Sequence, residues 1–253
     1  MSIADQLDAM MGQTRQLTGR EMSRCGLTLA KVTNINDDQK FNRVKCLPIG
    51  SENAEETDWC YVMTPMGGKE CGMFFFPQVN DLVVLAYLDD DPHRPLVLGG
   101  YWNNEVLPPY AVQNGKAEDY AIKTPKKIEL LFHDEEKKQK VTLTMPSGTV
   151  LTIDDENGQV SVKDKGGETS LAMDMKNGEV TLAAKTKLTL SAGKTSVVIE
   201  SGGNITQKGN GTVSLEGATV SVNGKTKAEV KGGSLDLNAS GIANLKGATV
   251  NIN

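Results

Sequence analysis

The side chains best suited to acid–base or nucleophilic chemistry are scarce in this sequence. It contains only two histidines, His93 and His133, and a Ser–His–Asp or Cys–His arrangement would have to use one of them. His93 lies in a turn between Pro92 and Pro95, and His133 is followed by the charged run 134–138, which is typical of a solvated hairpin turn. The sequence therefore predicts no catalytic residue and no enzyme activity.

Two acidic runs offer the oxygen ligands that divalent cations prefer, one over residues 89–91 and one over residues 154–158. The first run directly precedes Pro92, and the second ends in Asn157-Gly158, a strong hairpin-turn signal. Both runs are explained as turns without an ion. We therefore expect no bound metal and no cofactor.

The four cysteines, Cys25, Cys46, Cys60 and Cys71, contain no C-x-x-C pair. A zinc site would need more closely spaced ligands and histidine partners. Free cysteine behaves as a small buried apolar residue. We therefore expect buried free thiols.

The formal net charge is −5 and the sequence pI is about 5.2. Binding to a phosphate backbone needs clustered Lys and Arg, so nucleic acid is not an expected partner. No run of 18 apolar residues is present, and acidic residues interrupt the first 16 positions, so neither a membrane-spanning helix nor a signal peptide is predicted. We expect synthesis in the cytoplasm.

The composition changes sharply in the middle of the chain. The last aromatic residue is Phe132, the last arginine Arg94, the last cysteine Cys71 and the last proline Pro146. The final 107 residues contain none of these four kinds and are rich in Gly, Asn, Thr, Ser, Lys, Val and Leu. Two architectures are therefore expected: a first part with an ordinary core, and a second part with nothing large to bury.

The second part is repetitive. Apolar centres recur every seven to nine residues, with polar residues alternating around most of them, and Gly or Asn turn residues fall between several. Alternation of this kind predicts short strands with one buried face. The ten centres are Val180, Leu188, Val197, Ile205, Val213, Val220, Ala228, Leu235, Ala243 and Val250.

Such strands bury too little to be stable alone and must stack. A single-chain β-solenoid and an intertwined trimer of three chains both satisfy this requirement, whereas a disordered tail does not explain the regular alternation. We favour the trimer, a triple-stranded β-helix or β-prism, because the strands alternate strictly and no helical cap is apparent. Ten strands at about 4.8 Å each would make a needle on the order of 50 Å long.

Residues 1–25 predict a short helix or arm. Apolar side chains at Ile3, Leu7, Met10 and Leu17 fall at coiled-coil spacing over two to three heptads. A docking helix or partly ordered arm and a trimeric coiled coil both fit this pattern.

From Gly26 onward, short strands dominate, with turn residues between them. Five or six short antiparallel strands within about 75 residues are typical of a small OB-type barrel. We expect this all-β barrel over residues 26–103, a connector with the first prism strands over 104–146, and the repetitive needle over 147–253. The expected barrel strands are 27–34, 43–47, 58–63, 72–76, 82–88 and 96–99.

Three segments of the barrel region resemble a known family. They are Leu29-Ala30-Lys31-Val32-Thr33 followed by 41–46, Asp58-Trp59-Cys60-Tyr61-Val62 followed by 72–81, and 86–103, which contains Asp91-Pro92-His93-Arg94-Pro95-Leu96-Val97-Leu98-Gly99. In order and spacing they are similar to the OB barrel of phage baseplate assembly protein V and of VgrG-type spikes. One departure is Asn80, where the family usually has Gly; Asn also tolerates the left-handed conformation.

The resemblance implies a non-catalytic mechanical role. The subunit would form a homotrimer, its barrels would sit on the baseplate hub protein, and its prism would pierce the target envelope when the sheath contracts. The chain would be assembled into a phage-like tail particle. From this sequence we expect a stand-alone form without the fused hub module, the inserted lysozyme domain or the histidine-rich tip found in some relatives. We therefore expect a blunt C-terminal face, Val250, Asn251, Ile252 and Asn253, capped by a separate PAAR-like tip protein.

Two alternatives from other classes are an OB-fold nucleic-acid-binding protein with a β tail and a receptor-binding tail fibre. The first would need a basic aromatic groove, whereas residues 1–132 carry more acidic than basic side chains. The second would need exposed aromatic residues at the distal end, and the repeat region has none. The aromatic residues of the first part (Tyr61, Phe74, Phe75, Tyr87 and Trp102) are expected in the barrel core or at the hub contact.

Overall fold

A computed structural model describes residues 26–50 and 53–251 of the chain. Their secondary structure is all β, apart from the single 3-10 turn η1 (Leu88–Asp90). In this part of the chain, no helix is long and apolar enough to cross a membrane. The helix or arm expected over residues 1–25 lies outside the described residues. The chain divides into two compact units, residues 1–123 and 124–253.

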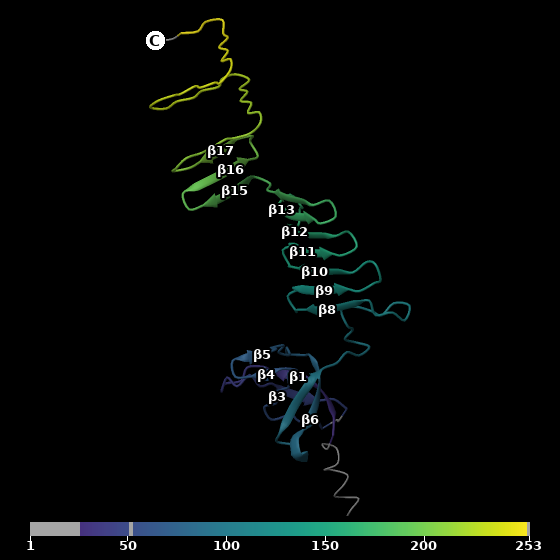
Figure 1. Ribbon diagram of the computed structural model, residues 1–253. Helices are drawn as coiled ribbons and strands as arrows, with labels where there is room; N and C mark the ends of the chain where they lie inside the picture. The colour runs from purple at the N-terminus through teal and green to yellow at the C-terminus, as the bar shows by residue number, and fades with distance from the viewer. Residues whose placement is uncertain (1–25, 51–52, 252–253) are drawn as a thin grey trace, which may run out of the picture. The chain divides into compact units, whose positions relative to one another are not determined.

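The first unit contains a curled five-stranded sheet (Figure 1). Its strands lie in the order β2-β1-β6-β7-β3, antiparallel except for the pairing of β3 with β7. An isolated antiparallel bridge between Val44 and Cys60 joins the regions just before β2 and β3 and closes the ring of pairings. The strands are β1 (Thr28–Asn34), β2 (Lys45–Pro48), β3 (Tyr61–Val62), β6 (Leu82–Tyr87) and β7 (Pro95–Gly100).

Alternation along these strands builds the barrel core. Ala30 and Val32 of β1 point inward, and the intervening Leu29 and Lys31 point outward. Eight apolar side chains are fully buried, and every buried apolar residue of the described chain lies in this barrel. They are Ala30, Val32, Val44, Cys46, Cys60, Val83, Leu85 and Val97.

The prediction of a strand over residues 72–76 is wrong. Only Cys71–Gly72 (β5) is paired there, in a hairpin with Gly67–Gly68 (β4). The three phenylalanines that follow have high β propensity, but propensity reflects packing beside another strand, and no strand of the described chain pairs with residues 73–76. The Asn80 turn forms as expected, with Asn80 in the left-handed region at φ 77°.

A seven-stranded antiparallel meander follows the barrel in the chain (Figure 1). Consecutive strands pair in sequence order, and each begins 9 to 11 residues after the previous one. The antiparallel order differs from the parallel stacking of a β-solenoid. The strands are β8 (Asp119–Lys123), β9 (Glu129–His133), β10 (Lys140–Thr144), β11 (Val150–Asp154), β12 (Gln159–Lys163), β13 (Ser170–Asp174) and β14 (Glu179–Ala183).

A separate three-stranded antiparallel sheet comes next. It consists of β15 (Lys187–Ala192), β16 (Thr195–Glu200) and β17 (Ile205–Lys208). Strands therefore occupy the first four of the ten apolar centres predicted from the sequence, from Val180 to Ile205.

The last six predicted centres carry no strand in the structure. Residues 209–251 have no assigned strand, and every residue there is exposed. These centres lie seven or eight residues apart, closer than the 9 to 11 residues between the starts of successive strands in the meander. The structure assigns no strand partner to the backbone groups of residues 209–251.

Candidate assembly surfaces

The barrel carries a shallow groove of about 420 Å³ beside β3 and the β6–β7 loop. Arg43 is fixed at its edge. Its guanidinium donates two 2.9 Å hydrogen bonds to the carboxylate of Asp37, and it lies 5.1 Å from the ring centroid of Phe41 and 5.7 Å from that of Trp59. The Arg43 hydrogen bond, with backbone N–H donors, lowers the pKa of Asp37 to about 2. Arg43 therefore stabilises the loop between β1 and β2.

The other cations around the groove are also paired with carboxylates. Lys45 Nζ lies 3.0 Å from Glu56, and Arg94 pairs with Asp89. His93 Nδ1 lies 2.7 Å from Asp58 Oδ2, with both side chains exposed. An oligonucleotide would have to compete with these carboxylates for every cation, so the groove does not favour a phosphate backbone.

The second histidine is in the other unit, in β9. His133 Nε2 lies 3.5 Å from Glu135 Oε2, and the same glutamate pairs with Lys138. These ion pairs belong to the β9–β10 hairpin turn, as the sequence predicted. The structure therefore places the two candidate histidines in different units, His93 in the turn before β7 and His133 at the end of β9.

Both acidic runs form turns. Asp89 and Asp90 adopt positive φ in η1, and Asp91 accepts a hydrogen bond from the backbone N–H of His93. Asp154 accepts hydrogen bonds from Asn157 and an ion pair from Lys140 at 2.9 Å, and these contacts lower its pKa to about 2. In the described residues, no group of three His, Cys, Asp or Glu side chains could hold a metal ion.

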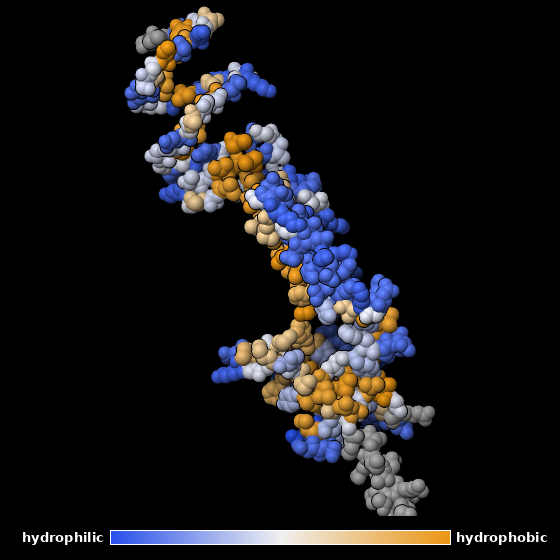
Figure 2. Space-filling model, turned by 45° about the vertical axis from the view of Figure 1, so that its right-hand side comes forward, coloured by the Kyte–Doolittle hydropathy of each residue, from blue (hydrophilic) through white to orange (hydrophobic). Residues whose placement is uncertain are grey.

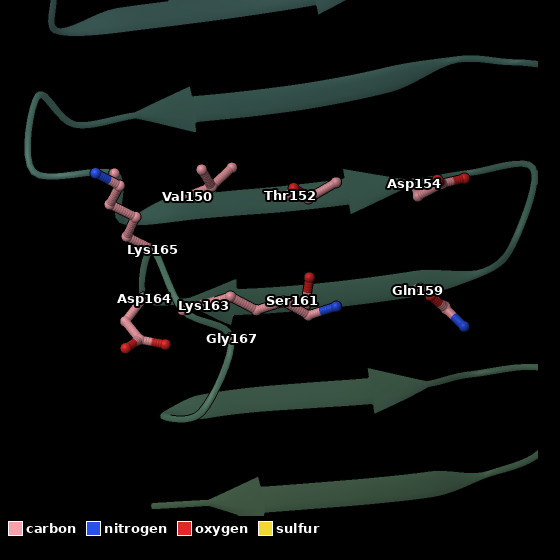
Figure 3. Close-up of a pocket in the computed structure, with 11 residues that line it drawn as sticks. Val150, Thr152, Asp154, Gln159, Ser161, Lys163, Asp164, Lys165 and Gly167 are labelled. Carbon is pink, nitrogen blue, oxygen red and sulfur yellow. The ribbon is translucent and has the colours of Figure 1, made fainter. Parts of the chain in front are cut away.

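A second shallow groove, of about 520 Å³, lies over β11 and β12 (Figure 3). Hydroxyl side chains of Thr152 and Ser161 line its floor, and the turn 164–167 forms one end. Asp154, at the other end, is already used by the hairpin turn and Lys140. We assign no ligand to this groove.

The cysteines behave as expected in only two of the three described cases. Cys46 and Cys60 are fully buried in the barrel core, and both contact Thr57. Cys71 is exposed in β5, so the expectation of a buried thiol is wrong there. The sequence placed Cys71 beside a Gly-Gly turn, a signal of a protruding hairpin that could have corrected this expectation. Cys25 lies outside the described residues.

Large apolar side chains are exposed on the segment of residues 63–76, which we call the arm. It includes the β4–β5 hairpin and leaves five of them open to solvent, with Phe74 73% exposed. The five are Met63, Met66, Met73, Phe74 and Phe75. Of the aromatic residues expected in the core or at a partner contact, Tyr61, Phe74, Phe75 and Trp102 are exposed and so do not form the core.

The meander has one strongly apolar face. Strand register aligns large apolar side chains from β9 to β14 in two parallel ladders on that face, and Figure 2 shows apolar residues running along this region beside polar ones. The first ladder is Leu130, Leu143, Leu151, Val162, Leu171 and Leu182; the second is Phe132, Val141, Ile153, Val160, Met173 and Val180.

On the opposite face of the same strands, the side chains that alternate with the ladder residues are mostly small and polar. Its central row contains Leu131, Thr142, Thr152, Ser161, Ala172 and Thr181. None of the twelve ladder residues is buried, and Val180 is 64% exposed. An apolar face of this extent on a sheet is typical of a surface that another chain covers.

The C-terminal residues expected to contact a tip protein are described only in part. Val250 and Asn251 are exposed, and Ile252 and Asn253 lie outside the described residues. Val250 is 51% exposed.

Comparison with protein families identifies the barrel. Residues 28–102 match the family model described as the Type VI secretion system/phage-baseplate injector OB domain. The matched range begins at β1 and ends just after β7, so it spans the five strands of the closed ring. A domain of this kind indicates a baseplate- or injector-related role for residues 28–102. The resemblance to the baseplate assembly protein V and VgrG-type spike family is thereby confirmed, and residues 28–102 are a phage-baseplate injector OB domain.

Proposed function

We propose that this chain is the central spike subunit of a contractile tail or injection system. Three copies form a needle that docks on the baseplate hub through the barrels and pierces the target envelope when the sheath contracts. The subunit acts mechanically and catalyses no reaction. The observation that carries the proposal is the open double ladder of apolar side chains on β9–β14, on a chain whose barrel belongs to the injector family.

The ladders support a trimer for a geometric reason. Each strand contributes only two inward side chains, such as Leu151 and Ile153 of β11. Three flat sheets arranged as a triangular prism would bring six such side chains together in each layer, and Phe132 is the one aromatic residue among the twelve ladder positions of a copy. The twelve ladder residues of each copy would then be removed from water, at about 25 cal/mol for each Å² of apolar area buried.

The strandless segment 209–251 supports the same proposal. Its alternating apolar residues are exposed in one chain, and Ile242 is 85% exposed. Copies winding around one another would supply both the missing strand partners and the cover for these side chains. We expect strands at the last six predicted centres, from Val213 to Val250, only in the trimer.

The family role supplies the remaining partners of the proposal. The barrels would contact a hub protein, and the C-terminal face formed by Val250, Asn251, Ile252 and Asn253 would receive a PAAR-like tip protein. The chain would be made in the bacterial cytoplasm and built into a phage-like tail particle. Nucleic acid is not a proposed partner, because the cations around the barrel groove are paired with carboxylates.

The mass of the purified chain tests the proposal. Multi-angle light scattering should give three times the chain mass of 27.2 kDa, and the trimer should persist in SDS without heating because separation would require unfolding every layer. A heated sample of the same protein is the control and should run as a single chain. A monomer in native buffer would contradict the spike proposal.

A further inference from the structure

The barrel carries two separate apolar surfaces on different elements. One is the arm, residues 63–76. The other is on the outer side of β1 and β2. We call this second surface the β1–β2 face. It consists of Leu27, Leu29, Leu47 and Ile49.

The arm is held in shape by its own contacts. The Thr64 hydroxyl donates a 2.5 Å hydrogen bond to the carbonyl of Met73, and the rings of Phe74 and Phe76 stack with centroids 5.6 Å apart. Gly72 has φ +148°, and a Cβ there would lie 2.5 Å from the carbonyl oxygen of Met66. The arm therefore presents its exposed Met and Phe side chains from a constrained backbone, which lowers the entropy lost on docking.

The β1–β2 face is also rigid. The Ile49 N–H donates a 2.8 Å hydrogen bond to the Leu29 carbonyl, and Lys31 lies opposite Leu47 in the strand register. The inward residues of these strands belong to the fully buried core. The face is thus an ordered sheet surface with apolar side chains directed to solvent, and Leu27 is 71% exposed.

Cyclic symmetry explains why one domain would have two such surfaces. In a ring of three copies, each interface is heterologous: one patch of a copy contacts a different patch of the next copy. A barrel that packs in such a ring needs two non-overlapping surfaces. The arm and the β1–β2 face meet this requirement, because they share no residue and come from different strands.

We propose that the arm of each copy packs on the β1–β2 face of the next copy around the threefold axis. The inference rests on the proposed trimer, which holds the barrels together through the connector and the needle. Tethering of this kind provides an effective concentration in the millimolar range, so an apolar contact too weak to dimerise free barrels is sufficient.

Charge supports this pairing. The tip of the arm carries Lys69 and Glu70, and the β1–β2 face carries Lys31 between Leu29 and Leu47. Within the described part of the chain, neither Glu70 nor Lys31 forms an ion pair. In the proposed docking the Glu70 carboxylate would face the Lys31 ammonium of the next copy, so charge would be complementary at this point, although Lys69 lies beside Glu70 at the same tip.

Cross-linking of the full-length protein tests the contact. Cys71 provides an exposed thiol in the arm, whereas Cys46 and Cys60 are buried. In a Cys25→Ser background, Lys31→Cys places a second thiol on the β1–β2 face. A short bis-maleimide should then couple position 31 of one copy to Cys71 of the next and yield covalent dimers and trimers on a denaturing gel. The matched control is Asp38→Cys, in the exposed β1–β2 loop outside both surfaces, which should give at least tenfold less cross-linked product.

A substitution in the arm provides a second readout. Phe74→Ser with Phe75→Ser should leave the trimer mass unchanged in light scattering and reduce the cross-link between position 31 and Cys71 at least tenfold. An intact trimer in which position 31 couples no better than position 38 would overturn the inference and leave the spike proposal standing. A monomeric mass would instead overturn the spike proposal itself.

Discussion

Truncating the side chain of one ladder residue tests whether other copies of the chain cover the apolar face of the meander or leave it exposed to solvent. Leu151 lies in the middle of the first ladder, between Leu143 and Val162, and is half-buried in the single chain. Its neighbour Thr152 lies on the opposite face of the same strand, between Thr142 and Ser161. Leu151→Ala and Thr152→Ala therefore probe the two faces of the sheet at adjacent positions of the same strand.

The magnitudes differ strongly if the ladders meet inside a trimer. A fully buried Leu→Ala change costs about 2–5 kcal/mol, so three copies lose about 6–15 kcal/mol of unfolding free energy per trimer. In an isolated sheet, where Leu151 keeps half its contact with water, the cost is about 1–2 kcal/mol per chain by area. Thr152→Ala, on a face that stays exposed, costs about 0.5 kcal/mol per chain in either case.

Guanidinium unfolding followed by far-UV circular dichroism, at two protein concentrations tenfold apart, measures this difference. The midpoint should rise with protein concentration, because trimer formation and folding are linked, and Leu151→Ala should lower it far more than Thr152→Ala. Equal shifts for the two variants, or midpoints independent of protein concentration, would refute the assignment of the ladders to a subunit interface.

Three further predictions concern the barrel. The pKa of Asp37 is lowered to about 2, so its ion pair stabilises the fold fully above about pH 4 and is lost as the pH falls toward 2; tryptophan fluorescence should show acid unfolding in this range that flattens in Asp37→Asn. Maleimide should modify Cys71 in the native protein within minutes and leave Cys46 and Cys60 unmodified until guanidinium is added, as intact-mass spectrometry would show. Gly72→Ala should distort the arm, because its Cβ meets a backbone carbonyl oxygen; limited trypsin digestion should cleave the arm several-fold faster than in the parent protein.

The barrel was predictable because local and global signals agree there. Turn residues such as Asn80 stand where the chain needs positive φ, and the inward positions of β1 hold small or branched apolar side chains. The arm was not predictable in the same way. Three consecutive phenylalanines are typical of a strand or of a core. In the structure, Phe74 and Phe75 are exposed, and no strand among the described residues pairs with them.

In the repetitive part, the sequence predicted alternation but not the register. The two ladders depend on hairpin turns of different lengths, because β10 begins 11 residues after β9 whereas β12 begins 9 residues after β11. A shift of one residue in either turn would send Leu151 or Val162 to the other face. The last six centres have the same alternation as β14–β17, yet they form no strand in one chain, because a strand also needs a partner for its backbone groups.

The two parts of the chain differ in how many of their side chains are buried. The barrel holds every buried apolar side chain of the described residues, so it can fold as a single chain. Within residues 124–251 the only buried residue is Asp154, a polar side chain at a hairpin turn. A segment without a core of its own cannot offset the entropy lost on ordering its backbone. The proposed trimer would supply this stability from other copies, and a needle assembled in this way would resist axial load because no copy could leave without unfolding.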